Sequence, residues 1–140
     1  MARKKNWLVI LAMVLVFGMV ATKVYAQSPA LRITERDLVG IWELENTENI
    51  PRNDLARRVE LFDDGTGVME VLLIRSWQNF AVTWQLRNSN RLQTTARIFG
   101  METTEINDIE LRENGTLLIF HYSGRNYSGA RAQRAMYRKR

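Results

Sequence analysis

The 140-residue sequence contains no cysteine and a single histidine, His121. Without cysteine the fold has no disulfide, so the domain has to rely on its hydrophobic core for stability. One histidine and no cysteine also exclude a zinc site built from the usual ligands. The acidic spacing of a calcium loop is absent as well. We therefore expect no metal site and no cofactor.

Signals of catalysis are equally scarce. No serine lies in a G-x-S-x-G context. His121 falls in an expected strand, where a structural hydrogen bond is the simpler interpretation. Asp63 and Asp64 precede Gly65, and we expect their side chains to cap a turn. The sequence therefore predicts a protein that is not an enzyme.

Residues 1–26, MARKKNWLVILAMVLVFGMVATKVYA, have the features of a secretory signal peptide. Three basic residues precede an apolar run over 8–21, and the segment ends in Val-Tyr-Ala, a suitable cleavage site. The apolar run is shorter than the about 20 residues that cross a bilayer. We expect cleavage, export to the periplasm or the medium of a bacterium, and no stable membrane span afterwards. A retained anchor is the alternative.

The basic excess of the chain comes mainly from this leader. Four of the 20 Lys and Arg residues lie in 1–26, which leaves 16 basic against 15 acidic side chains in residues 27–140. A nearly neutral domain does not predict nucleic-acid binding. Residues 124–140 nevertheless hold six basic and no acidic side chains. This end can meet an acidic partner or membrane surface, or simply balance the acidic body.

Short alternating runs, separated by turn residues, recur after a lead-in at 27–36 that we expect to be flexible. They predict strands at 38–45, 57–62, 68–74, 80–86, 92–98, 103–111, 116–122 and 132–138. The stretches DDGTG, RSWQN, RNSN and RENG are expected to be connecting turns. Closing such a meander removes its exposed edges. The predicted fold is therefore all-β, an eight-stranded antiparallel up-and-down barrel forming one domain over 37–140.

The first strand, DLVGIWELE, resembles the G-x-W opening of lipocalin-like proteins. Later pieces resemble, in order, the hairpins and closing strand of small bacterial lipocalin-like domains: LFDDGTGVME, VTWQLRNSNRLQTT, IELRENGTLLIF and MYRKR. The resemblance implies that Gly40 and Trp42 mark the closed end of the barrel. It also implies that an arginine of the last strand, either Arg134 or Arg138, lies across the tryptophan ring.

A lipocalin-like barrel implies a ligand site in its interior. The alternation predicts an interior made of Phe80, Val82, Trp84, Leu92, Ile98, Leu117 and Ile119. Such an interior favours a small apolar or aromatic ligand. The alternative is that these side chains fill the barrel. A different class of function is a protein-binding module, such as a secreted protease inhibitor that uses residues 27–36 or the loops.

Overall fold

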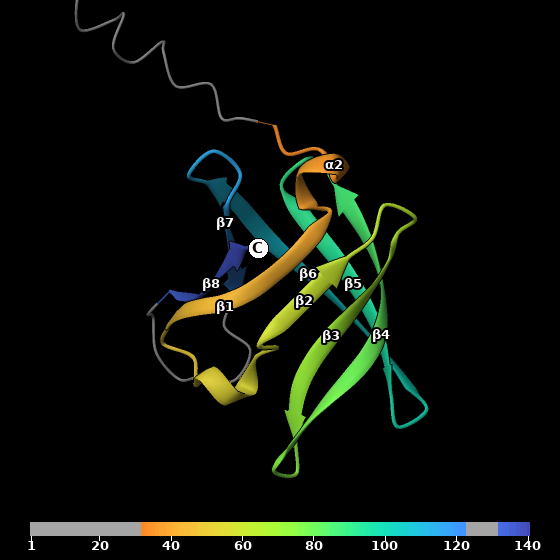
Figure 1. The fold of residues 1–140 in the computed structure, drawn as a ribbon. Helices are drawn as coiled ribbons and strands as arrows, with labels where there is room; N and C mark the ends of the chain where they lie inside the picture. The colour runs from red at the N-terminus through yellow and green to blue at the C-terminus, as the bar shows by residue number, and fades with distance from the viewer. Residues whose placement is uncertain (1–31, 123–131) are drawn as a thin grey trace, which may run out of the picture. The chain divides into compact units, whose positions relative to one another are not determined.

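Eight antiparallel strands in sequence order form a closed barrel in the computed structural model, which describes residues 32–122 and 132–140 (Figure 1). The strands are β1 (Gly40–Glu48), β2 (Arg58–Leu61), β3 (Thr66–Leu73), β4 (Ser76–Arg87), β5 (Arg91–Ile98), β6 (Met101–Arg112), β7 (Leu117–Tyr122) and β8 (Gln133–Lys139). β8 pairs with β1 and so closes the sheet. The up-and-down barrel predicted from the alternating runs is confirmed.

Alternation decides which side chains face the interior. On β4, Val82 and Trp84 are buried, whereas the intervening Thr83 and the neighbouring Ala81 and Gln85 are exposed. The same period continues on β5, which pairs with β4 so that Trp84 lies opposite Thr94. Successive side chains of a strand point to opposite faces, so each strand contributes every second residue to the interior.

The chain enters the barrel through the short helix α2 (Glu35–Leu38), which lies where β1 begins (Figure 1). Its first turn is capped, since the backbone N–H and the hydroxyl of Thr34 both donate hydrogen bonds to the Asp37 carboxylate, at 2.8 and 2.9 Å. Leu38 is completely buried and Ile33 is 7% exposed. Residues 32–36, assigned from the sequence to a flexible lead-in, therefore belong to the folded unit. The predicted signal peptide at 1–26 and the rest of the lead-in, 27–31, lie outside the described residues.

Two predicted turns differ in detail from those observed. In RSWQN the turn is not formed by residues 75–79, because Leu73 already pairs with Ser76 and only Ile74 and Arg75 connect β3 to β4. Trp77 is consequently a strand residue of β4. In DDGTG, Gly65 has a positive φ of +81°, as a glycine in a tight turn can, but Gly67 does not. Gly67 is required for another reason: a Cβ there would collide with the carbonyl oxygen of Glu60 on the paired strand β2.

Candidate ligand-binding cavity

One end of the barrel is filled with large side chains. Trp42 is completely buried, and its indole N–H donates a hydrogen bond of 2.8 Å to the carbonyl oxygen of Leu38. The indole N–H of Trp84 donates to the carbonyl oxygens of Phe62 and Thr66, both at 3.0 Å, and so attaches the ring to the turn between β2 and β3. Every buried polar group of these rings is thus satisfied, as a dry core requires.

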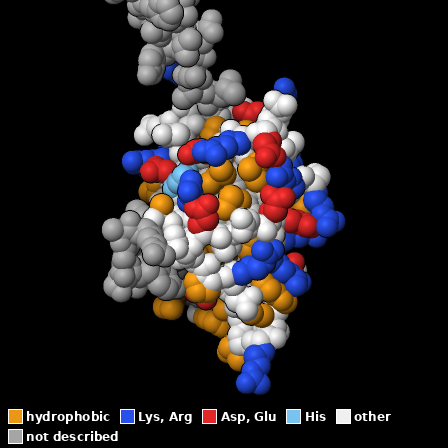
Figure 2. All heavy atoms as spheres, turned by 90° about the vertical axis from the view of Figure 1, so that its left-hand side faces the viewer, with side chains coloured by type: hydrophobic (Ala, Val, Ile, Leu, Met, Phe, Trp, Pro, Cys, Tyr) orange, Lys and Arg blue, Asp and Glu red, His pale blue; other side chains and the backbone are white. Residues whose placement is uncertain are grey.

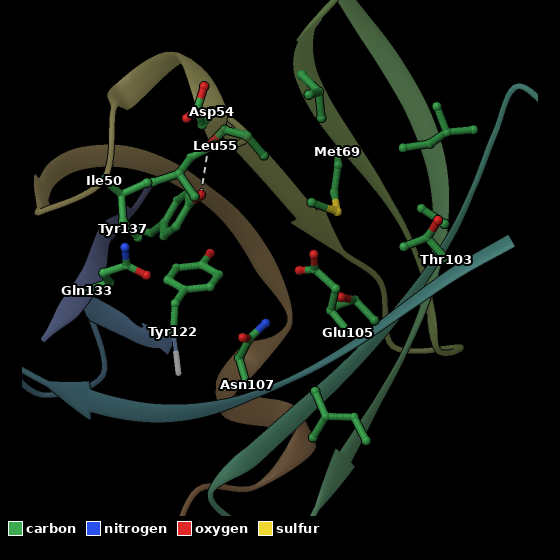
Figure 3. Close-up of a pocket in the computed structure, with 16 residues that line it drawn as sticks. Ile50, Asp54, Leu55, Met69, Thr103, Glu105, Asn107, Tyr122, Gln133 and Tyr137 are labelled. Carbon is green, nitrogen blue, oxygen red and sulfur yellow. Dashed lines mark hydrogen bonds between the residues drawn. The ribbon is translucent and has the colours of Figure 1, made fainter. Parts of the chain in front are cut away.

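The other end of the barrel contains a cavity of about 450 Å³, within the usual range for small-molecule sites (Figure 3). β1 starts at the filled end and leads into the loop that borders this cavity. Most of the lining is apolar or aromatic: Ile50, Leu55, Ala56, Met69, Val71, Ala96, Ile98, Ile106, Tyr122 and Tyr137. The polar and charged members are Asp54, Thr94, Thr103, Glu105, Asn107 and Gln133.

Small side chains on the inner faces of β5 and β6 create this space. Thr94 and Ala96 follow Leu92 along the inner face of β5, and Thr103 lies opposite Ala96 on β6. Where bulky residues continue, as at Leu92 and Leu118, the barrel is filled instead. The two alternatives left open by the sequence, a filled barrel and an open one, therefore apply to opposite ends of the same molecule.

The loop between β1 and β2 is held at the cavity by hydrogen bonds. The Tyr137 hydroxyl donates to the carbonyl oxygen of Ala56 at 2.8 Å. Arg52, in the 3-10 helix η1 (Arg52–Asp54), donates to the carbonyl oxygens of Leu44 and Glu45 at 2.7 and 3.1 Å. This side of the cavity is therefore built before any ligand arrives.

Two tyrosines contribute phenol groups to the cavity. Burial raises the pKa of Tyr122 well above its usual range, and the nearby negative charge of Glu105 raises it further. Burial likewise raises the pKa of Tyr137. Both phenols stay protonated at neutral pH; the O–H of Tyr137 is donated to Ala56, whereas that of Tyr122 can donate to a ligand. Figure 3 shows Glu105 and Tyr122 pointing into the same space.

The seven residues predicted to line the interior lie in different parts of the barrel. Ile98 lines the cavity, whereas Val82, Trp84 and Leu92 are buried in the core. Phe80 lies on the inner face opposite Met69, which borders the cavity.

Leu117 and Ile119 have the opposite parity to the inward-facing residues of β7, so placing them in the barrel lumen was wrong. Ile119 is nevertheless buried, with 3% of its surface exposed. The two residues alternate with Leu118 and Phe120, which belong to the core. Four consecutive apolar residues, Leu-Leu-Ile-Phe, carry no alternation, and their orientation was therefore not readable from the sequence.

The cation over Trp42 comes from Lys139, not from Arg134 or Arg138. The Lys139 ammonium lies 5.2 Å from the centre of the Trp42 ring, and Lys139 is the residue paired with Trp42 across β8 and β1. Arg134 and Arg138 have the opposite parity to Lys139 on β8, so they lie on the outer face of the barrel. There they form ion pairs with Glu48 and Glu45. Gly40 supports this arrangement, because a Cβ there would lie 3.0 Å from Cε of Lys139.

The groups examined for chemistry have structural partners. His121 Nε2 lies 2.9 Å from a carboxylate oxygen of Glu110. Asp64 accepts hydrogen bonds from the backbone N–H and the hydroxyl of Thr66, which confirms its predicted turn-capping role. Over residues 32–122 and 132–140, no three His, Asp or Glu side chains are grouped as metal ligands. No helix in this part of the chain is long and apolar enough to cross a membrane.

Several important cavity residues were not predicted, above all Glu105, Tyr122 and Tyr137. The alternation on β5 already placed Thr94 and Ala96 on the inner face, and their small size was the available signal for open space. A scan of protein-family models finds no match to this chain, and a search of curated proteins finds no significant similarity.

Proposed function

We propose that this protein is an exported, non-catalytic, lipocalin-like binding protein that holds a small apolar or aromatic ligand in the open half of its barrel. The observation that carries the proposal is the cavity of about 450 Å³ above a dry core, with mostly apolar and aromatic walls. Export rests on the signal-peptide features of residues 1–26. The G-x-W opening supports a lipocalin-like relationship, whereas the cation over Trp42 departs from the implied pattern, since it is Lys139 and not an arginine.

Burial of apolar ligand surface would supply the affinity, at roughly 25 cal/mol per Å² before the costs of association. The η1 loop is already fixed by Tyr137 and Arg52, so little additional ordering is needed on that side. A pre-formed site of this kind binds with a smaller entropic cost than one that must fold around its ligand.

The alternative, insertion of the N-terminal segment into another protein, is less well supported. Ile33 is buried in the core cluster, and Thr34 and Asp37 form the cap of α2. Residues 32–36 would have to leave these contacts before they could enter a protease. The small-ligand function needs no such rearrangement.

Isothermal titration calorimetry with a neutral aromatic probe, 2-(1-naphthyl)ethanol, tests the proposal. We expect saturable binding near one equivalent. Ala96→Phe places a ring in the cavity and should weaken binding at least tenfold. Thr95→Phe, at the neighbouring position on the outer face of β5, is the matched control and should leave binding unchanged. Absence of binding, or equal effects of the two substitutions, would refute the lumen as the site.

A further inference from the structure

We infer that the ligand of this cavity carries a positively charged group, held by Glu105, on an apolar or aromatic body. This inference rests on the proposed function and specifies the chemical class of its ligand. It excludes fatty acids and other simple carboxylates as preferred ligands.

The first observation is the sign of the charges on the cavity wall. Among the residues that line it in the described part of the chain, only Asp54 and Glu105 are charged, and both are acidic; Asp54 already has an interaction of its own, so Glu105 is the charge that a ligand would meet. No described Lys, Arg or His belongs to the lining. An anionic ligand would therefore meet like charge without a described counter-ion. A cationic ligand would be attracted to Glu105, and because this residue is exposed, water and salt reduce that attraction.

The second observation is the position of Glu105. It lies on the inner face of β6, opposite Thr94, and its carboxylate points into the cavity near Met69 and Tyr122 (Figure 3). Its charge contributes to the raised pKa of Tyr122, although burial of the phenol is the larger cause. The carboxylate is therefore close enough to act electrostatically on a group inside the cavity.

Glu105 also differs from the carboxylates on the outside of the barrel. Figure 2 shows acidic and basic side chains intermixed on one outer face. Between β1 and β8, Glu45 and Glu48 pair with Arg138 and Arg134 at 2.9 and 2.7 Å. Glu105 is exposed and makes no ion pair or hydrogen bond among the described residues, so a cationic ligand would replace water, and not a protein partner, at its carboxylate.

The third observation is the aromatic surface beside this carboxylate. Tyr122 and Tyr137 line the cavity, and Phe120 contacts both rings from the core, with centroid distances of 6.3 and 5.4 Å. An ammonium group over a tyrosine ring is attracted by the ring quadrupole. The side chains of Asn107 and Gln133 offer carbonyl oxygens to its N–H groups. Carboxylate, ring and amide together match an amine better than any neutral or anionic group.

Three probes of one shape test the inference: 2-(1-naphthyl)ethylamine as its ammonium, 2-(1-naphthyl)ethanol, and 1-naphthylacetate. At pH 7 and low salt we expect the ammonium to bind about tenfold more tightly than the alcohol, and the acetate more weakly than both. Glu105→Gln should bring the ammonium and the alcohol to equal affinity while leaving the alcohol unchanged. Glu102→Gln is the matched control, since Glu102 is an exposed residue of the same strand with the opposite parity.

The outcomes separate this inference from the proposed function. If the alcohol binds but the ammonium has no advantage, or the acetate binds most tightly, the charge inference is overturned and the proposed function stands. An ammonium preference that survives in Glu105→Gln overturns the role of Glu105. If no probe binds, both proposals fail together. Measurements on the unaltered protein at rising salt concentration give a second readout, because the ammonium preference should shrink as charges are screened.

Discussion

Replacing Trp42 with phenylalanine tests the construction of the closed end. Trp42 is completely buried, and its indole N–H donates to the carbonyl oxygen of Leu38, which is itself buried. Phenylalanine retains an aromatic ring but has no donor, so this carbonyl would lose its partner. The smaller ring would also leave a void next to Leu38 and beneath the ammonium of Lys139.

The expected loss of stability is the sum of these two effects. An unsatisfied buried carbonyl costs about 1–3 kcal/mol. The ring shrinks by roughly three heavy atoms, which at about 0.8 kcal/mol per buried carbon group adds about 2 kcal/mol. We expect a decrease of about 3–5 kcal/mol in the free energy of unfolding. At about 5 °C per kcal/mol for a domain of this size, the melting temperature should fall by roughly 15–25 °C.

Urea unfolding followed by far-ultraviolet circular dichroism measures this loss. Trp77→Phe is the matched control. Trp77 has the opposite parity to the inward-facing Trp84 of β4, so it lies on the outer face of the barrel, and its ring contacts the guanidinium of Arg57 at 4.2 Å. That contact is worth about 1 kcal/mol or less at an exposed site. Equal losses of unfolding free energy in the two variants would refute the conclusion that Trp42 is a buried, hydrogen-bonded residue of the closed end.

Three further predictions concern other parts of the barrel. Lys139→Met removes the cation over the tryptophan ring but retains most of the side chain; it should destabilise the fold by about 0.5–2 kcal/mol in urea unfolding, whereas Lys139→Arg should not. Ile74 and Arg75 form a two-residue turn with φ of 45° and 68°, a geometry that prefers Asn-Gly. The double substitution Ile74→Asn with Arg75→Gly should therefore raise the free energy of unfolding by about 1–2 kcal/mol, and a lower melting temperature would contradict the turn geometry. Hydrogen bonds from Thr34 lower the pKa of Asp37, so its contribution to stability is present above its unfolded pKa of about 4 and is lost as the pH falls through the lower folded value. Stability should consequently decrease less between pH 7 and pH 3 in Asp37→Asn than in the unaltered protein, as measured by urea titrations at the two pH values.

The barrel itself could be predicted because its signals are local. Clean alternation on β4 and β5 identified their inner faces, including Val82 and Trp84. Turn residues such as Asp64 and Gly65 separated the strands and are now seen in the expected roles. Eight alternating runs joined by short turns leave few arrangements other than a closed meander, so the sequence by itself determined the fold class and most strand positions.

Which side chains meet inside and around the barrel could be determined only from the tertiary structure. An uninterrupted apolar run hid the orientation of β7, and Leu117 and Ile119 were assigned to the wrong face. Lys139 lies over Trp42 because the register between β8 and β1 pairs the two residues, which no local pattern reveals.

The cavity has the same origin. It exists where small side chains of β5 and β6 face a loop that Tyr137 and Arg52 hold in place, and Glu105 acquires its role only because that assembly surrounds it. The alternation of apolar and polar residues along a strand predicts which side chains point inward. How much space they leave depends on partners far away in the chain, and only the closed barrel brings those partners together.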